Sequence, residues 1–541
     1  MTGPAQPLQQ NISCLLRRAQ RAHEAGELAK AERLYNALLR HQPDNFDALH
    51  GLGRLHYQRG RLATALLLIQ MALQSDDGRA DGFASLGLVF HLLRRFKEAL
   101  ASYDAGLRIA PRDSELLNRR GVALLELHRP RDAVENFERI LAADPDHLDA
   151  LGNCGNALLK LNRPAEALAA YDRALRVVPD NAQLLTNRAV TLRRLDRPHE
   201  ALMSASRALV ARPDFAQARF VESVARLTLG DFTAGWRGYE ARWSVGLLAS
   251  QRRGFTAPLW LGQESLEGKT ILLHAEQGFG DAIQFVRYTR LVAGRGTKKI
   301  ILEVQRELAR LLSGGLRSDI AGLDAVIARG ESLPPFDCHC PLLSLPLAFA
   351  TEPTTIPADI PYLAPVAEEI GRWRERLPQR RPLIGLAWSG DRSHDNDLNR
   401  SLRLDQLAPL LDLPDVAFIS LQRVVREEDV AVLQSRSHVV RLGEQFCDFA
   451  DTAAAVSLMD AVISVDTAVA HLAGAMGKPL FLLLPFAADF RWLRERDDSP
   501  WYPTARLYRQ PKFGDWDSVI GTLSQDLLRA DFFPLAHRLS A

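Results

Sequence analysis

The chain has 541 residues, enough for roughly three or four domains of ordinary size. Its 67 Lys and Arg residues nearly balance its 65 Asp and Glu residues, and the formal charge of +2 gives no overall attraction to nucleic acid or to an anionic membrane. With 24% charged and 47% hydrophobic residues, the composition is that of a globular protein and excludes a mainly disordered or collagen-like chain.

The cysteines and the N-terminal residues predict a cytoplasmic protein. Five cysteines are too few and too scattered to form a disulfide framework, which fits a reducing compartment. Residues 1–10 lack the basic and apolar stretches of a signal peptide, and the most apolar later segment, residues 479–488, is short and contains a proline. We expect no membrane span, and we expect residues 1–12 to be a flexible N-terminus.

A repeat of 34 residues occupies the first 215 residues. Prolines recur at this spacing, and Asp77 takes the place of one of them. The alanine series is Ala31, Ala65, Ala99, Ala133, Ala167 and Ala201; the glycine series is Gly53, Gly87, Gly121 and Gly155; the aromatic series is Tyr35, Tyr103, Phe137 and Tyr171. This pattern resembles the tetratricopeptide (TPR) repeat, in which each repeat is a pair of antiparallel helices.

The repeat predicts a superhelix of stacked helix pairs over residues 13–247. Small Gly and Ala residues let helices approach closely, and we expect the aromatic side chains to wedge between successive pairs. One pair cannot bury its apolar face, so about six pairs stack and leave a concave surface for a protein partner. Residues 216–243 predict a divergent seventh pair that caps the stack.

Asparagines on the first helices of the repeats are candidates to line the concave surface. These are Asn118, Asn153, Asn156 and Asn187. Side-chain amides can bind a peptide backbone, so a ladder of them predicts a peptide site, with plain surface polarity as the alternative. The array by itself predicts a protein partner and no activity.

Near residue 250 the repeat gives way to an α/β pattern of two lobes, residues 248–365 and 366–541. Short apolar runs predict strands at 269–274 and 299–304 in the first lobe, and at 382–387, 416–421, 461–465 and 479–484 in the second. We expect one helix over 282–293 and a proline-rich connection over 333–365. Sites in such parallel sheets form at the carboxyl ends of the strands.

A G-x-G turn follows the first predicted strand. Gly278 and Gly280 stand just before a helix, where backbone N–H groups can approach an anion or a substrate. The third glycine of a dinucleotide fingerprint is absent, and the chain has no Walker motif. Asp281 is either an acid of the helix's first turn or N-cap, or a general base that faces a cleft.

A second strand-to-helix junction carries Asp466, Thr467 and His471. Thr467 and His471 are four residues apart, so they share a helix face near an N-terminus that favours phosphate. Asp466 would repel a phosphate, so we expect it to cap the helix or to orient the other two. The alternative for His471 is a structural histidine.

Two loops after other predicted strands add hydrogen-bond donors. Ser389, Gly390 and Arg400 follow one strand and Gln422 follows the next, which suits an anion, although a solvated loop is the alternative. The D-x-D at 395–397 has no other spaced ligands, and Cys338-His339-Cys340 is too compressed for zinc, so we predict no metal site. Aromatic residues at 491–492 and 499–502 suit either stacking on a base or sugar or a lobe interface.

The chain resembles bacterial TPR-containing glycosyltransferases with a heptosyltransferase-like GT-B domain. Besides the repeats, the resemblance rests on Gly280-Asp281, on Asp466-Thr467 with His471, and on the segment 451–454 (Asp-Thr-Ala-Ala). The resemblance implies an α + α/β chain: an N-terminal TPR α-solenoid followed by a GT-B pair of Rossmann-like lobes, the first on the acceptor side and the second on the nucleotide-sugar side. The chain departs from the family pattern at Ala468, where heptosyltransferases commonly have Gly.

The resemblance also implies roles and partners. It implies a sugar transfer from a nucleotide-sugar co-substrate to a Ser or Thr hydroxyl of a protein held by the repeats, with Asp281 as the general base. The implied transfer is metal-independent, inverts the anomeric carbon and needs no other cofactor. Flagellin is the candidate acceptor, because TPR-bearing relatives modify it. The implied donor-binding residues are Ser389, Gly390, Arg400, Gln422, Asp466, Thr467 and His471, and the acceptor-binding residues are Gly278, Gly280, Asn118, Asn153 and Asn187. A non-catalytic TPR scaffold and a transferase acting on an envelope glycan are the alternatives.

Overall fold

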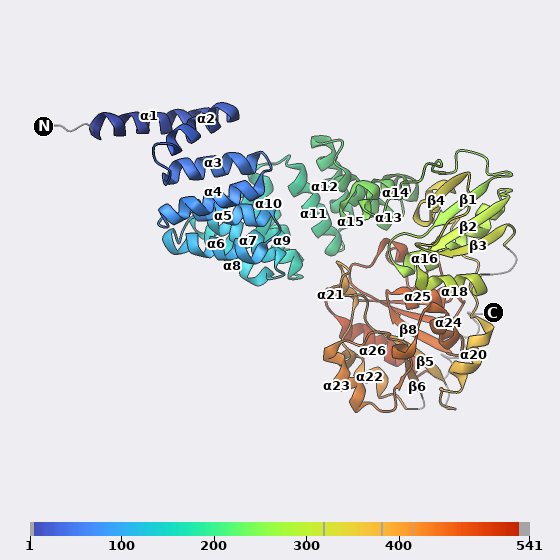
Figure 1. The fold of residues 1–541 in the computed structure, drawn as a ribbon. Coiled ribbons are helices and arrows are strands. Elements are labelled where there is room, and N and C mark those ends of the chain that lie inside the picture. The colour runs from blue at the N-terminus through green and yellow to red at the C-terminus, as the bar shows by residue number, and fades with distance from the viewer. Residues whose placement is uncertain (1–4, 317–319, 380–381, 415, 530–541) are drawn as a thin grey trace. The chain divides into compact units, whose positions relative to one another are not determined.

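A computed structural model describes residues 5–316, 320–379, 382–414 and 416–529 (Figure 1). The chain forms two compact units that divide between Asn187 and Arg188. The first unit is helical, and the second contains the last repeat helices and the α/β lobes.

Antiparallel helices make up the repeat region. They are α1 (Ala5–Glu24), α2 (Leu28–Leu39), α3 (Phe46–Gln58), α4 (Leu62–Ser75), α5 (Ala80–Leu92), α6 (Phe96–Ile109), α7 (Ser114–Glu126), α8 (Pro130–Ala143), α9 (Leu148–Lys160), α10 (Pro164–Val177), α11 (Ala182–Arg194), α12 (Pro198–Ala211), α13 (Ala216–Thr228) and α14 (Phe232–Tyr239). Each proline of the 34-residue series follows the end of a second helix, as expected. The first helix begins at Ala5, so residues 5–12 are helical where we expected a flexible segment; residues 1–4 lie outside the described residues.

The glycines and aromatic residues of the repeat pack against each other within one helix pair. A Cβ added to Gly121 of α7 would lie 2.5 Å from the Phe137 ring of α8, and one added to Gly155 of α9 would lie 2.5 Å from the Tyr171 ring of α10. These contacts lie within one pair, whereas Tyr35 of α2 makes the expected contact between successive pairs, since a Cβ added to Gly51 of α3 would lie 2.6 Å from its ring. The glycine is needed because the ring occupies the space that a side chain would fill.

The first lobe contains a parallel sheet with the strand order β3-β2-β1-β4. Its strands are β1 (Thr270–His274), β2 (Lys299–Val304), β3 (Leu323–Ala328) and β4 (Cys338–Pro341). The expected single helix over 282–293 is instead α16 (Phe279–Phe285), the 3₁₀ turn η2 (Val286–Tyr288) and α17 (Thr289–Ala293). The expected connection over 333–365 contains β4 and the short helix α19 (Leu345–Ala348), because its buried Cys and Leu residues complete the sheet's core.

The second lobe contains a parallel sheet with the order β10-β9-β8-β5-β6-β7. Its strands are β5 (Leu383–Ala387), β6 (Ala417–Ser420), β7 (Val440–Arg441), β8 (Ala461–Val465), β9 (Leu480–Leu484) and β10 (Ala505–Arg509). Its longer helices are α20 (Ala367–Arg374), α23 (Glu427–Ser435), α24 (Phe449–Ser457), α25 (Ala468–Ala475) and α26 (Trp516–Leu527). All pairings between the strands of both sheets are parallel, so the α/β prediction is confirmed.

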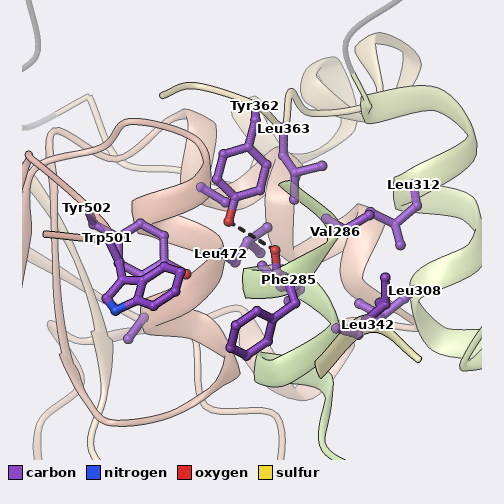
Figure 2. Close-up of a cluster of buried hydrophobic side chains, with 14 of the residues drawn as sticks. Phe285, Val286, Leu308, Leu312, Leu342, Tyr362, Leu363, Leu472, Trp501 and Tyr502 are labelled. Atoms are coloured by element: carbon purple, nitrogen blue, oxygen red, sulfur yellow. Dashed lines mark hydrogen bonds between the residues drawn. The ribbon is translucent and has the colours of Figure 1, made fainter. Parts of the chain in front are cut away.

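One continuous apolar core joins the two lobes and the seventh helix pair. It contains Trp236 and Tyr239 of α14, the strands of the first sheet, and one face of the second sheet with α24 and α25. Figure 2 shows Phe285 of α16 near Leu472 of α25 and Trp501 of the second lobe. A large apolar interface of this kind holds the lobes together as a unit. Within the described residues, no helix is long and apolar enough to cross a membrane.

Candidate functional site

The site begins where α16 of the first lobe meets α25 of the second. Both helices follow directly after the carboxyl end of a strand, β1 and β8 respectively. A Cβ added to Gly280 would lie 2.8 Å from His471 Cδ2 and 3.6 Å from the Cα of Ala468. Only a glycine at position 280 lets the two helices approach this closely, and the approach brings together the two motifs that the sequence singled out.

Asp281 occupies the first turn of α16. One carboxylate oxygen accepts the backbone N–H of Gly278 at 2.9 Å, so Asp281 is an acid of the helix's first turn, as one of the two readings of the sequence predicted. The other oxygen accepts a hydrogen bond from the guanidinium of Arg491. The side chain retains 19% exposure, which leaves the carboxylate open to a substrate.

His471 is buried between the lobes. Its Nδ1 lies 2.9 Å from the Tyr502 hydroxyl, and its ring stacks on Trp492 with the centroids 5.4 Å apart. Burial, reinforced by the charge of Arg491, lowers the pKa of His471 to about 3. The imidazole is therefore neutral near pH 7 and adds no positive charge to the site.

Asp466 follows the strand β8 directly and lies close to His471. Its Oδ1 lies 3.7 Å from Nε2 of His471, and burial, together with the nearby Asp489, raises the pKa of Asp466 to about 6. Thr467 takes the N-cap position of α25, and its hydroxyl lies 3.1 Å from that of Ser464. Of the two roles expected for Asp466, capping is wrong, because Thr467 takes the N-cap position of α25, whereas the 3.7 Å separation from His471 is compatible with an orienting role.

The loops after β5 and β6 bring their candidate residues together at the same sheet edge. The Ser389 backbone N–H donates to the Gln422 side chain at 3.2 Å, and that side chain donates back to the Ser389 carbonyl at 3.0 Å. Arg400 donates to the Asp466 carbonyl at 3.1 Å, and a Cβ added to Gly390 would lie 2.6 Å from its guanidinium. In the described part of the chain, the buried hydroxyl of Ser389 has no hydrogen-bond partner.

The D-x-D loop uses its second carboxylate within the protein. Asp397 is buried and accepts hydrogen bonds from Arg426 at 2.5 Å and Ser401 at 2.7 Å. Cys338 and Cys340 are buried in β4. Among the residues that the structure describes, no three His, Cys, Asp or Glu side chains are grouped to hold a metal ion.

The structure also places residues that the sequence did not connect to Asp281. Arg491 contacts Gln284, Asp489 and Asp281, and it comes from the short 3₁₀ turn η6 (Phe490–Trp492) after β9. Trp501 and Tyr502 are fully buried, and the Trp501 ring lies edge-on to Phe285 of the first lobe, with centroids 5.6 Å apart, so the 499–502 segment lies at the lobe interface. Arg491 and Asp281 are 210 residues apart, and no local spacing signals that they meet.

The predicted asparagine ladder is partly used within the array. Asn153 donates to Asn118 at 3.0 Å, and Asn187 donates to Asn156 at 3.1 Å, each across neighbouring repeats. These hydrogen bonds fix the orientation of the amides. Among the residues that the structure describes, the Asn118 N–H groups and the Asn153 oxygen make no further hydrogen bond, so they can serve as a donor and an acceptor for a peptide backbone.

The site combines an accessible carboxylate with groups that suit an anion. Asp281 can take up a proton, and its neighbour Gly280 packs against Ala468 at the N-terminus of α25. The Arg400 guanidinium, which donates to the Asp466 carbonyl, adds positive charge to the second lobe's part of the site. Parallel α/β sheets bind ligands at this carboxyl edge of their strands.

Comparison with known proteins identifies the repeats. The tetratricopeptide repeat family matches residues 16–81, 118–183 and 154–215, which confirms that this region consists of TPR repeats. Protein FlbA of Caulobacter vibrioides is 27% identical over 328 residues, a match that covers 57% of this chain and 54% of FlbA. The chain thus spans about half the length of this curated relative.

Solved structures of repeat proteins are also similar to this chain. A tetratricopeptide repeat protein from Parabacteroides merdae matches with 18% identity and a TM-score of 0.38, over 44% of this chain and 97% of its own. The pilF protein of Pseudomonas aeruginosa matches with 17% identity and a TM-score of 0.36, over 39% of this chain and 96% of its own.

Proposed function

We propose that this protein is a glycosyltransferase that moves a sugar from a nucleotide-activated donor to a Ser or Thr hydroxyl of a protein recruited by the TPR repeats. The observation that carries the proposal is the contact of α16 with α25 at Gly280 and His471, which brings Asp281 to the helix end that suits the donor's phosphates. The heptosyltransferase-like GT-B resemblance assigns the same two motifs to the base and to the donor.

The proposed transfer needs one base and one anion site. Asp281 takes the proton from the acceptor hydroxyl as its oxygen bonds to the anomeric carbon, and the bond from that carbon to the phosphate oxygen breaks. The nucleotide leaves with the electron pair, and the end of α25 with Arg400 stabilises the growing negative charge. Attack opposite the leaving group inverts the anomeric carbon. Because fixed protein groups supply the positive charge, the proposal includes no metal.

The acceptor side of the proposal rests on the repeats. TPR repeats commonly hold protein segments on their concave surface, and the oriented amides of Asn118 and Asn153 match the donor and acceptor groups of a peptide backbone. Flagellin remains the acceptor that the family resemblance suggests.

Thermal unfolding with a panel of nucleotides tests the proposal. UDP, GDP, CDP, CMP and ADP are added in turn, and a ligand at 100 times its dissociation constant stabilises the folded protein by about 2.7 kcal/mol. We expect one nucleotide to raise the melting temperature selectively, and we expect Arg400→Gln to remove that effect. Arg436→Gln is the control, because Arg436 is about as buried as Arg400 and pairs with Asp412 instead.

The opposite results would decide between the remaining readings. If no nucleotide shifts the melting temperature, a scaffold without transferase activity replaces the proposal. If a nucleotide binds but a small glycan acceptor reacts as well as any protein, the transferase acts on an envelope glycan.

A further inference from the structure

We propose that Arg491 is a positioning residue of the transfer site, which holds the carboxylate of Asp281 in place from the opposite lobe. The inference rests on the proposed function. It adds to that function a second-lobe residue and a role for the seventh helix pair, neither of which any sequence motif assigns.

The geometry of Arg491 supports this role. Its Nε donates to the Gln284 side chain at 2.7 Å, and Gln284 and Asp281 both belong to α16. Its Nη1 donates to Asp489 at 2.8 Å, and its Nη2 donates to Asp281. A planar guanidinium with three anchored N–H groups has little freedom to move, so it fixes the position of the carboxylate that it holds.

The seventh helix pair supports the turn that carries Arg491. Phe490 lies edge-on to Trp236 and Tyr239 of α14, with centroids 5.6 and 6.0 Å apart. Trp236 also contacts Phe285 of α16 at 6.0 Å. The same aromatic cluster therefore braces both α16 and the Arg491 turn, so the pair that we expected to cap the stack also forms part of the site's framework.

Proton uptake by Asp281 changes the charge balance around Arg491. Before transfer, one guanidinium faces two carboxylates, Asp281 and Asp489. When the acceptor O–H bond breaks and its proton bonds to Asp281, that carboxylate becomes neutral, and Arg491 is left balanced by Asp489 alone.

The test measures kcat and the KM of the donor in full-length variants, with a sugar donor built on the nucleotide that the panel identifies. We expect Arg491→Gln to lower kcat by about tenfold to a hundredfold while the donor KM stays near that of the wild type, because the carboxylate loses its fixed position. Arg491→Lys should restore part of kcat but not all of it, because lysine keeps the positive charge and loses the planar guanidinium. Asp489→Asn should lower kcat less than Arg491→Gln does, because the guanidinium keeps its bonds to Gln284 and Asp281.

A matched control uses Arg494, three residues further along. It pairs with Asp196 at 3.0 Å, and Arg494→Gln should keep the kcat and the donor KM of the wild type. An unchanged kcat in Arg491→Gln would overturn the proposal, and so would a change confined to the donor KM. If Arg491→Gln does not fold, Arg491→Lys still decides, because a wild-type kcat in that variant would show that the planar guanidinium is not needed. Failure of the proposed function is separate, because it appears as a lack of nucleotide binding or as full turnover in a variant without Asp281.

Discussion

The repeat array and the α/β lobes differ in the distance along the chain at which their polar groups find partners. In the first unit, the amides of Asn118 and Asn153 pair across 35 residues, one repeat plus one position. In the second unit, Arg491 reaches Gln284 and Asp281 across 207 and 210 residues. A periodic sequence can therefore reveal the architecture of the array, whereas the chemistry of the lobes depends on contacts that no local pattern contains.

The largest expected effect comes from removing the carboxylate of Asp281. Asp281→Asn keeps the size of the side chain and an oxygen that can accept the Gly278 N–H, but it cannot take up the acceptor's proton. We expect turnover to fall by about a hundredfold to ten-thousandfold, with the nucleotide-induced melting shift retained. Steady-state kinetics with the identified donor measures the first effect, and thermal unfolding measures the second.

Asp412→Asn is the control for this variant, because Asp412 also pairs with an arginine, Arg436, but lies outside the site. Equal turnover of Asp281→Asn and Asp412→Asn would remove Asp281 as the base. The long-range contacts of the second unit would then be structural, like the local contacts of the first.

The same contrast explains what the sequence could predict. The 34-residue series predicted the helix pairs, and apolar runs predicted β1, β2, β5, β6, β8 and β9. Four strands were missed. The strand β3 is only half-buried, β7 has two residues, β4 is built from Cys-His-Cys-Pro inside a proline-rich segment, and β10 (Ala-Arg-Leu-Tyr-Arg) has no continuous apolar run. Strand-to-helix junctions pointed to Asp281, Asp466 and His471.

The partners of those residues could not be predicted. Asp489 and Gln284 belong to no sequence motif, and Arg491 stood out only as a neighbour of the aromatic residue Trp492. They join the site because α16 and α25 meet at Gly280, and because Trp236 and Tyr239 brace the loop from another part of the chain. Such convergence is a property of tertiary packing, which the periodicity of one segment does not encode.

A buried carboxyl at the end of β1 gives the second unit a pH dependence of its own. Glu276 is 2% exposed and bonds to Arg242 at 2.8 Å, yet burial raises the pKa of Glu276 to about 7 from an ordinary value of 4.5. A raised pKa in the folded state means that folding takes up a proton, so stability is fully present below pH 4.5 and is lost as the pH rises to 7. The loss should reach about 3 kcal/mol.

Urea unfolding of the wild type and Glu276→Gln at pH 5, 6, 7 and 8 measures this effect. Glutamine resembles the protonated carboxyl, so we expect the two proteins to converge at pH 5 and the variant to be the more stable one at pH 8. Tryptophan fluorescence follows this unit alone, because all eight tryptophans lie at or beyond residue 236. Parallel pH curves for the two proteins would contradict the assignment to Glu276.

The smallest expected effect tests the local packing of the first unit. In Gly155→Ala, the new Cβ would lie 2.5 Å from the buried Tyr171 ring, and such overpacking costs about 1–3 kcal/mol. The better helix propensity of alanine offsets about 1 kcal/mol of this cost, so we expect the free energy of unfolding of the first unit to fall by about 1 kcal/mol. Far-UV circular dichroism should record this loss, while tryptophan fluorescence should not, since residues 1–187 contain no tryptophan.

Gly371→Ala in α20 is the matched opposite, because no atom lies within 4 Å of the new Cβ and the variant lies in the tryptophan-containing unit. It should be stabilised by up to about 1 kcal/mol, and its fluorescence transition should shift. An unchanged circular dichroism transition in Gly155→Ala would show that the Tyr171 ring moves aside at no cost. A shift of the fluorescence transition in Gly155→Ala would show instead that the two units unfold together, and the contrast between local and long-range contacts would then not extend to stability.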